Sequence, residues 1–406
     1  MPSRDGGTLH VLLIGAVPPP VGGARVSFQQ ALDELRTRPG VRTSVIPTWP
    51  AGEGLFRKLL PACRVTLVTL LKARDASVIV FFAAAGGIIL WAPILHAIAR
   101  LFGKPWILRA FGGGFDRVYA RLPGAVRTCV RRTSLSADLV LFQTSHLVRH
   151  FRSILPGNNV FWHANSRPVG PQSLPACHKV CRRFVFIGHV NPCKGVGDIL
   201  QASDILGEGV EIHVFGPLQG GLEEADFDCY HQVVYRGILP PDDVISTLRG
   251  YHALLLPTHY VDEGLPGVIL EAYSVGIPVV ASRWSAIPEI VDGTSGILVT
   301  PGDPLDLARA MQRLVDDASL YRALSRGAWW KAREFSLRSW TDILVSYCHA
   351  AVCRSPLTTA LVCGHSELAG GRTPSRTIAY EGPAAAASDE GWSFVSPQPG
   401  GSSTSC

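Results

Sequence analysis

Short apolar runs alternate with amphipathic segments along the first 170 residues, and this alternation predicts parallel strands separated by helices. The chain opens with an apolar strand, a proline- and glycine-rich loop that ends at Gly23, and an amphipathic helix over Ala24–Leu35. Nucleotide-binding sheets share this opening, although a tight turn after the first strand would give the same pattern. The strands predicted in this half are His10–Ile14, Val78–Phe82, Trp106–Ala110 and Leu139–Phe142.

One apolar stretch, Ala76–Ala99, is long enough to cross a membrane. Its 24 residues carry no formal charge, and a bilayer core needs about 20 apolar residues. Gly86, Gly87 and Pro93 interrupt the stretch, so we predict a strand, a small-residue loop and then a helix over Ile88–Phe102. A spanning helix and a helix lying in the membrane interface are the alternatives.

After a linker over Asn165–His178, strands and helices alternate again. Two doubly wound α/β domains in tandem leave a cleft, and ligands of such sheets bind beyond the carboxyl ends of the strands. The strands predicted in the second domain are Phe184–Ile187, Glu211–Phe215, Val233–Arg236, Ala253–Leu256 and Pro278–Ala281. The helices predicted there are Val196–Ile205, Pro240–Leu248, Pro266–Val275, Leu305–Asp316 and Leu320–Glu334.

The predicted organisation has four parts along the chain. A first domain covers residues 1–170, a second covers 171–336, and a further helix, Leu337–Val352, lies within residues 337–354. Residues 355–406 are rich in Gly, Ser, Pro, Ala and Thr with little periodicity, which is typical of a disordered tail.

Composition narrows the class of protein. The 406 residues are 47% hydrophobic and 17% charged, which excludes a mostly disordered chain, a coiled coil and a collagen-like fibre. The mean hydropathy of +0.21 is apolar for a soluble protein. Residues 1–170 contain 21 Lys and Arg against 7 Asp and Glu, whereas the remainder contains 17 against 25. Since no nucleic-acid-binding motif is present, we expect the basic half to meet an anionic membrane surface rather than nucleic acid.

The ten cysteines are scattered, which is typical of a reducing, cytosolic setting. Cys177, His178 and Cys181 lie close in the sequence, but a zinc site needs about four ligands and no second pair is near. The chain begins without a signal-peptide pattern. We therefore expect a cytoplasmic protein, peripheral on the inner face of the cell membrane, and a transporter is not favoured.

The strongest chemical signal is the segment Asp262–Gly267, which follows a predicted strand and opens a predicted helix. The first N–H groups of a helix suit a phosphate, and glycine lets the backbone approach a ligand closely. Glu263 precedes the helix, while Glu271 falls two turns into it, where a carboxylate can hold the hydroxyls of a ribose. A capped surface helix with two solvated glutamates is the alternative.

A second polar loop, Gly188–Gly195, also lies between a predicted strand and a predicted helix. Lys194 can act as a point charge for phosphate oxygens, although a lysine at a strand end is more often a solvated surface charge. The two loops lie about 70 residues apart in the sequence. Their joint occurrence at strand ends favours a functional site over two unrelated surface features.

In these motifs the chain resembles the family 4 retaining glycosyltransferases, which have the GT-B fold of two Rossmann-like domains. Gly188–Gly195 is similar to that family's Gly-Arg-x-x-x-x-Lys-Gly loop, and Glu263–Glu271 is similar to its Glu-x7-Glu motif. The resemblance covers about residues 8–350 and is strongest over 184–315. Further matching segments are Gly276–Ser282, Pro288–Val291, Gly293–Leu298 and Pro301–Asp303.

The resemblance implies a nucleotide-diphosphate sugar as the donor, held mainly by the second domain, with no other cofactor and no metal ion. It assigns Lys194 to the donor diphosphate and Glu271 to the ribose, and it makes Glu263 and Lys194 the expected catalytic residues. Glu263 would hold the donor sugar and phosphate together with the backbone of Gly264, Leu265, Pro266 and Gly267. The remaining implied donor contacts are Ile238 and Leu239 for the base, and Gly22 and Gly23 for the phosphates. The final helix resembles one that packs back on the first domain.

Two positions depart from the family pattern. The usual arginine of the first loop is His189 here, and histidine is mostly neutral at about pH 7, which predicts weaker or pH-dependent neutralisation of the diphosphate. A His-Gly pair often follows a strand of the first domain, where this chain has the glycine-rich segment Arg109–Asp116. Arg109 or Asp116 is the expected replacement on the acceptor side, and a glycine-rich loop beside a buried arginine is the alternative.

The expected function is transfer of a hexose-type sugar, with retention, to a glycan or lipid-linked acceptor in the synthesis of cell-surface polysaccharide or glycolipid. The leaving phosphate would accept the acceptor's proton, while Lys194 and the helix at Pro266 would stabilise the charge on the diphosphate. A sugar 2-epimerase of the same fold and a catalytically silent binding or scaffold protein are the alternatives.

Overall fold

The computed structural model describes residues 8–19, 22–48, 55–169 and 180–355, and all of them belong to one compact unit. Cys177 and His178 of the predicted linker lie outside these residues, as does the predicted tail apart from Ser355. The four-part division of the chain stays a prediction.

The first sheet consists of six parallel strands in the order β2-β1-β3-β4-β5-β6. β3, β4 and β5 are buried throughout, which explains why each is a nearly continuous apolar run in the sequence. The strands are β1 (Leu9–Gly15), β2 (Val41–Pro47), β3 (Val78–Ala83), β4 (Trp106–Ala110), β5 (Leu139–Phe142) and β6 (Val160–Trp162).

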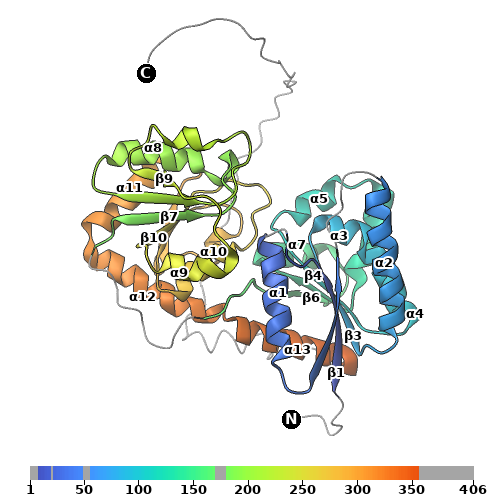
Figure 1. Cartoon of the computed structure of the whole chain (residues 1–406). Coiled ribbons are helices and arrows are strands. Elements are labelled where there is room, and N and C mark those ends of the chain that lie inside the picture. The colour runs from blue at the N-terminus through green and yellow to red at the C-terminus, as the bar shows by residue number, and fades with distance from the viewer. Residues whose placement is uncertain (1–7, 20–21, 49–54, 170–179, 356–406) are drawn as a thin grey trace, which may run out of the picture. The chain divides into compact units, whose positions relative to one another are not determined.

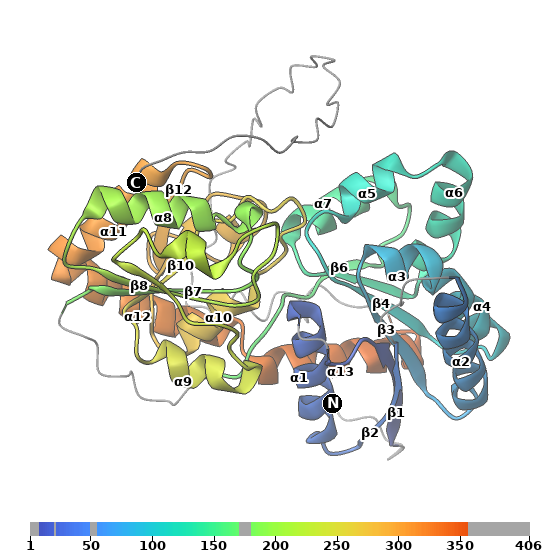
Figure 2. The ribbon, with the colours of Figure 1, turned by 45° about the horizontal axis from the view of Figure 1, so that its top comes forward.

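Helices cover both faces of this sheet (Figures 1 and 2). On one face α1 (Gly23–Arg36) and α13 (Leu337–Cys353) bury Phe28 and Leu344 against strand residues such as Leu13. Successive side chains of a strand point to opposite faces, so the neighbouring Leu12 lies in the core of the other face. That other face carries α2 (Leu55–Ala73), α3 (Ala85–Leu90), α4 (Ala92–Leu101), α5 (Phe115–Arg121), α6 (Gly124–Arg132), α7 (Ser145–Ile154) and the 3-10 helix η1 (Ser134–Ser136).

The helix expected over Ile88–Phe102 is in fact two helices, α3 and α4, which meet at Trp91. Pro93 lies in the first turn of α4. Proline lacks the N–H that a helix interior needs but is tolerated at a helix start, so a new helix begins there. No helix among the described residues is long and apolar enough to cross a membrane.

The second sheet also has six parallel strands, in the order β12-β11-β10-β7-β8-β9. Its core is one continuous cluster of buried apolar residues. The strands are β7 (Arg183–Ile187), β8 (Glu211–Phe215), β9 (Val233–Tyr235), β10 (Ala253–Leu256), β11 (Val279–Ser282) and β12 (Gly296–Val299).

Two groups of helices pack on the second sheet, and Figures 1 and 2 show them on opposite faces. One group is α8 (Val196–Leu206) with α11 (Pro304–Asp316); the other is α9 (Val244–Leu248), α10 (Gly267–Ser274) and α12 (Ala318–Glu334). The 3-10 helices are η2 (Pro192–Lys194), η3 (Glu224–Phe227), η4 (Pro241–Asp243) and η5 (Ile287–Glu289).

Two predicted helices of this half begin later than expected. The segment from Pro240 starts as η4 and becomes α-helical only at Val244. Pro266 caps α10 from outside in an extended conformation, so Gly267 rather than Pro266 is the first helical residue. The two doubly wound parallel sheets confirm the predicted fold class.

Candidate functional site

The loops after β7 and β10 lie at the point where the second sheet changes the direction in which strands are added. β7 and β10 are neighbours, yet the chain continues from β7 to β8 on one side and from β10 to β11 on the other. Open α/β sheets bind ligands at such a point, beyond the carboxyl ends of the strands. Lys194 follows β7, and Glu263 and Glu271 follow β10, so the topology brings the predicted donor residues to one place.

The loop after β7 is held in shape by its own residues and by Pro257 at the end of β10, the neighbouring strand in the sheet. The Asn191 side chain accepts a hydrogen bond from the Lys194 N–H at 3.0 Å and caps η2. Gly195 has a φ of +76°, and a Cβ atom there would lie 2.1 Å from the carbonyl oxygen of Pro257. Only glycine fits both the left-handed conformation and this contact, which fixes Lys194 against the end of β10.

Lys194 and Glu263 form an ion pair between the two loops. The Lys194 Nζ atom lies 2.5 Å from Glu263 Oε2, which also accepts a hydrogen bond from Thr258 Oγ1 at 3.0 Å. The ammonium group lies 4.8 Å from the ring centre of Tyr260. Glu263 is buried, and charge-assisted hydrogen bonds are strong where water is excluded. The arrangement places one fixed cation and one oriented carboxylate side by side.

The amino end of α10 has no acidic side chain of its own to balance its positive charge. Its N-cap residue, Pro266, makes no side-chain hydrogen bond, and its first turn contains no acidic residue. The first N–H groups of a helix have no partners within the helix and carry its positive dipole end. Gly267 begins this helix four residues after Glu263, so the helix end adjoins the ion pair.

Glu271 lies about one turn into α10, rather than the expected two, because the helix begins only at Gly267, and it is paired with Arg167. The Arg167 Nε atom lies 2.5 Å from Glu271 Oε1, and Arg167 Nη1 donates to Ser27 Oγ at 2.9 Å. Arg167 is not among the predicted site residues, because it lies alone in the predicted linker. Its signal in the sequence is a single charge, five residues after the end of β6.

The glycines at the start of α1 lie close to this cluster. Gly22 is the N-cap of α1, and the carbonyl oxygen of Gly23 accepts a hydrogen bond from Ser27 Oγ at 2.8 Å. Among the described residues, no atom lies within 4 Å of where a Cβ atom would stand on Gly22 or Gly23. Through Ser27, the predicted phosphate-facing glycines are therefore connected to Arg167 and Glu271.

The remaining donor-side residues lie at the same edge of the second sheet. His189 is exposed in the loop after β7. Ile238 and Leu239 follow β9, and Ile238 is an exposed large apolar side chain, whereas Leu239 packs against the core. An exposed apolar side chain at a strand's carboxyl end can contact the flat face of a base.

Arg109 does not lie where an acceptor could reach it. Its side chain is 2% exposed and donates hydrogen bonds to the carbonyl oxygens of Ala110 at 2.8 Å and Ala164 at 3.2 Å. Burial lowers the pKa of Arg109 to about 9. The alternative of a glycine-rich loop beside a buried arginine is what the structure shows.

Asp116 forms an ion pair with His146 on α7, at 2.9 Å between Oδ2 and Nε2. Burial favours the neutral carboxyl, but the hydrogen bonds from His146 and from the Arg117 N–H hold the pKa of Asp116 below its usual value. The same hydrogen bond raises the pKa of His146. Asp116 therefore positions His146.

The glycine-rich segment after β4 touches the donor loop directly. The Gly113 N–H donates to the carbonyl oxygen of Asp262 at 3.3 Å. A Cβ atom on Gly113 would lie 1.9 Å from the carbonyl oxygen of Glu263, so glycine is required for this approach. A contact of this kind depends on the absence of a side chain, which a search for chemical groups overlooks.

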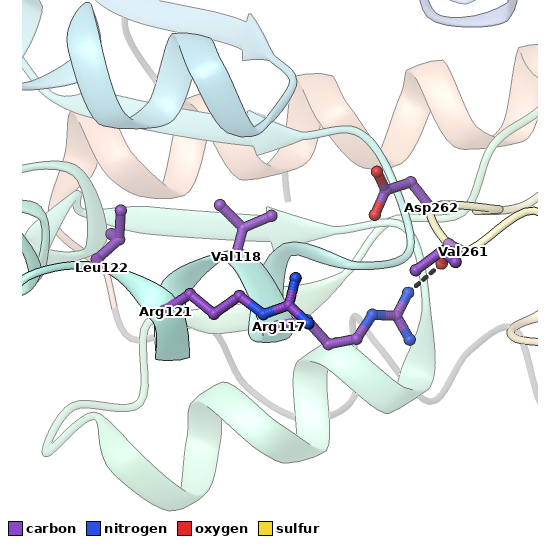
Figure 3. A pocket seen from close by; sticks show the side chains of 6 residues that line it. All are labelled: Arg117, Val118, Arg121, Leu122, Val261 and Asp262. Atoms are coloured by element: carbon purple, nitrogen blue, oxygen red, sulfur yellow. Dashed lines mark hydrogen bonds between the residues drawn. The ribbon is translucent and has the colours of Figure 1, made fainter. Parts of the chain in front are cut away.

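A pocket of about 330 Å³ lies beside this contact, where α5 faces the loop before Glu263 (Figure 3). Arg117 reaches across and donates a hydrogen bond to the carbonyl oxygen of Val261. The residues that line the pocket are Arg117, Val118, Arg121, Leu122, Val261 and Asp262. Sequence reasoning missed the two arginines, since they belong to a generally basic half of the chain.

Comparisons with known proteins establish the family of the chain. The family model "Glycosyl transferases group 1" matches residues 181–317. D-inositol 3-phosphate glycosyltransferase of Corynebacterium jeikeium (strain K411) is 37% identical over 359 residues, which cover 76% of this chain and 82% of the relative. O-antigen chain mannosyltransferase B of Escherichia coli is 29% identical over 232 residues, 51% of this chain and 59% of that protein. The chain belongs to the group 1 glycosyl transferases, as the motifs predicted.

A solved structure, Anabaena Alr3699/HepE in complex with UDP, is similar with a TM-score of 0.65 at 14% identity. The similarity covers 84% of this chain and 100% of that chain, and it confirms the GT-B fold. The alignments with three curated relatives, the O-antigen mannosyltransferase among them, cover only 22%, 59% and 51% of those relatives' own length.

Proposed function

We propose that this protein transfers a hexose-type sugar from a nucleotide-diphosphate sugar to a hydroxyl of a glycan or lipid-linked acceptor, with retention of configuration. The observation that carries the proposal is the meeting of Lys194, Glu263 and Glu271 at the switch point of the second sheet, in a chain that belongs to a glycosyltransferase family. The related O-antigen chain mannosyltransferase and the solved UDP complex agree with a glycan acceptor and a nucleotide-sugar donor.

The proposed step needs only groups that the site contains and the two substrates. The acceptor oxygen forms a bond to the anomeric carbon while the bond from that carbon to the diphosphate oxygen breaks on the same face. The acceptor's proton passes to the leaving diphosphate oxygen. Lys194 and the amino end of α10 stabilise the negative charge that builds on the diphosphate, and Glu263 holds the donor sugar by its hydroxyls.

The acceptor enters, in this proposal, beside the pocket formed by α5 and the loop before Glu263. Arg117 and Arg121 favour an acceptor that carries an anionic group, such as a lipid-linked phosphate. This assignment replaces Arg109, which is buried, and leaves Asp116 to orient His146.

We further propose that the protein binds an anionic membrane surface through a strip of exposed apolar residues on α2, α3 and α4. The strip consists of Leu67, Leu71, Leu90, Ile94 and Leu101, which are 43–72% exposed. Exposed basic residues flank it: Arg64, Lys72, Arg74 and Arg100. α4 packs against both α2 and α3, and these three helices contain no acidic residue. An apolar strip with a basic margin is complementary to an anionic bilayer.

The proposed activity is tested with the purified full-length protein, a panel of labelled UDP-, GDP- and ADP-sugars, and lipid extract or oligosaccharide as acceptor. We expect the label to appear in an acceptor product. NMR of that product should show that the new linkage has the anomeric configuration of the donor. Conversion of the donor to its 2-epimer without an acceptor would show an epimerase. Nucleotide binding without any turnover would show a silent binding protein.

Membrane binding is tested by sedimentation with vesicles of phosphatidylcholine alone or mixed with phosphatidylglycerol. We expect binding only to the anionic vesicles, a decrease with salt, and release by alkaline carbonate. The double variant Leu67→Ser, Leu71→Ser should bind the anionic vesicles less. Ile205→Ser is the control, because it removes an exposed large apolar side chain on α8, outside the strip, and it should bind as the wild type does. Equal binding to both vesicle types would contradict the proposal.

A further inference from the structure

Arg167 is a buried cation fixed by its own backbone. Arg167 is 3% exposed. Arginine is seldom buried so completely without a partner. The Arg167 N–H donates to the carbonyl oxygen of Phe335 at 3.0 Å, and its carbonyl accepts from the Leu337 N–H at 2.8 Å. These bonds join it to the segment that leads into α13, so the side chain starts from a fixed point.

The guanidinium group of Arg167 contacts elements that the proposed donor site uses. Nε bonds to Glu271, and Nη1 bonds to Ser27 Oγ and to the carbonyl oxygen of Ser166. The third nitrogen, Nη2, has no hydrogen bond to the residues that the structure describes. A Cβ atom on Gly267 would lie 1.8 Å from Nη2, so this nitrogen lies against the first residue of α10.

This position is electrostatically unusual. The amino end of a helix is its positive end, and a second positive charge beside it is unfavourable unless an anion lies close to both. The first turn of α10 contains no acidic residue and has no side-chain cap. Glu271 meets Arg167 through Nε alone, which leaves the side of the guanidinium toward Gly267 suited to a further acidic oxygen.

We infer, on the basis of the proposed function, that Arg167 binds the donor diphosphate through Nη2. On donor binding the ribose hydroxyls replace the guanidinium at Glu271, and the phosphate oxygens replace Glu271 at the guanidinium. Arg167 thereby supplies a permanent positive charge in addition to Lys194, since the loop after β7 has the exposed His189 at the position of the family's usual arginine.

The experiment is calorimetric titration of the wild type, Arg167→Gln and Arg167→Lys with UDP, GDP and ADP, and with the three nucleosides. For the nucleotide that the wild type binds best, Arg167→Gln should weaken diphosphate binding at least about tenfold. The nucleoside should bind as before or more tightly, because Glu271 has lost its competitor. The diphosphate affinity of Arg167→Lys should fall between those of the wild type and Arg167→Gln, since lysine keeps the positive charge but lacks the paired N–H donors of the guanidinium group.

A rescue variant separates charge supply from a merely structural role. The double variant Arg167→Gln, His189→Arg should bind the diphosphate at least about threefold more tightly than Arg167→Gln alone. Arg38→Gln is the matched control, because it also removes an arginine ion pair, with Glu34 and Asp342, just before β2 at the opposite edge of the first sheet.

Equal losses for diphosphate and nucleoside, in Arg167→Gln or in the milder Arg167→Lys, would overturn the inference and make Arg167 a support for Glu271. Unchanged diphosphate affinity, or no rescue by His189→Arg, would also overturn it. A wild type that binds none of the three diphosphates would instead contradict the proposed function itself. Melting temperatures identify any variant that fails to fold. If Arg167→Gln fails to fold, the same comparison of diphosphate and nucleoside binding is made with Arg167→Lys.

Discussion

The two sheets have the same number of parallel strands but very different carboxyl edges. The second sheet presents charged side chains there, with Lys194, Glu263 and Glu271 on loops from two adjacent strands. The first sheet presents mainly backbone there, with Gly22, Gly23 and Gly113 at its loops, and one buried charged side chain, Arg167. In our proposal the second edge binds the donor diphosphate and the first approaches it closely, so each needs a different kind of test.

The largest effect is expected for the charged edge. Lys194→Ala should weaken nucleotide-sugar binding by about 1.5–3 kcal/mol, because it removes a cation and leaves the buried carboxylate of Glu263 without its partner. Calorimetry measures this loss. Lys331→Ala is the control, since it removes a lysine ion pair, with Asp292, that lies outside the donor loops. Equal affinities for the wild type and Lys194→Ala would show that the ion pair is only structural.

The backbone edge is tested by adding one methyl group. Gly113→Ala places a Cβ atom 1.9 Å from the carbonyl oxygen of Glu263, and relieving such an overlap costs about 1–3 kcal/mol. We expect sugar transfer to slow about tenfold while nucleoside binding at Glu271 is kept. Gly124→Ala has no atom within 4 Å of its new methyl group and should behave as the wild type. If the two variants have the same kcat, the contact between the loops has no role in transfer.

A smaller effect is expected at the pocket beside α5. Arg121→Gln should raise the KM for an anionic acceptor by up to about fivefold, as an exposed charge contributes about 0.2–1 kcal/mol, and should leave the KM for the donor unchanged. Steady-state kinetics with each substrate varied in turn separates the two constants. Arg127→Gln, on the neighbouring α6, serves as the control. A rise in the donor KM alone would move this pocket to the donor side.

The smallest effect concerns the pair of Asp116 and His146. The raised pKa of His146 means that its contribution to stability is full below about pH 6.5 and is lost as pH rises through the folded pKa. The lowered pKa of Asp116 sets the acid limit, because the contribution of Asp116 to stability is lost as pH falls below about 4. The pair therefore stabilises most between these values, and because the His146 side chain is 56% exposed we expect no more than about 1 kcal/mol.

Asp116→Asn should lower the pKa of His146 in an NMR titration and should reduce the free energy of unfolding most between about pH 4 and 6.5. Asp33→Asn, which breaks an exposed pair with Arg36, is the matched control and should leave the His146 titration unchanged. An unchanged His146 titration in Asp116→Asn would show that the hydrogen bond does not form in solution.

Apolar runs predicted the central strands of both sheets, because a strand buried on two faces must be apolar at nearly every position. They did not predict β2, β6 and β12, which lie at sheet edges and are only partly buried. The sequence pattern was also not sufficient to place helix ends near prolines. Pro93 starts a new helix within the predicted one, and Pro266 lies outside α10, because a proline near a helix start fits more than one position.

Side chains were predictable where the chemistry lies in one local segment. Lys194 and Glu263 lie in short loops with a glycine and a proline at fixed positions, so the sequence contains the whole signal. Arg167 meets Glu271 across 104 residues, and this contact exists only because the fold brings the segment after β6 to α10. Arg109 was misjudged for the same reason, since only the fold shows that its side chain turns inward to Ala164.

The central claim, that the switch point of the second sheet binds the donor, is tested most directly by hydrogen–deuterium exchange with mass spectrometry. The full chain is compared with and without whichever of UDP, GDP and ADP binds best in titration. We predict slower exchange in peptides that cover residues 188–195 and 263–271, and unchanged exchange over 64–74 on the outer surface of the first sheet. Protection that spares both loops while the nucleotide is bound would contradict the account.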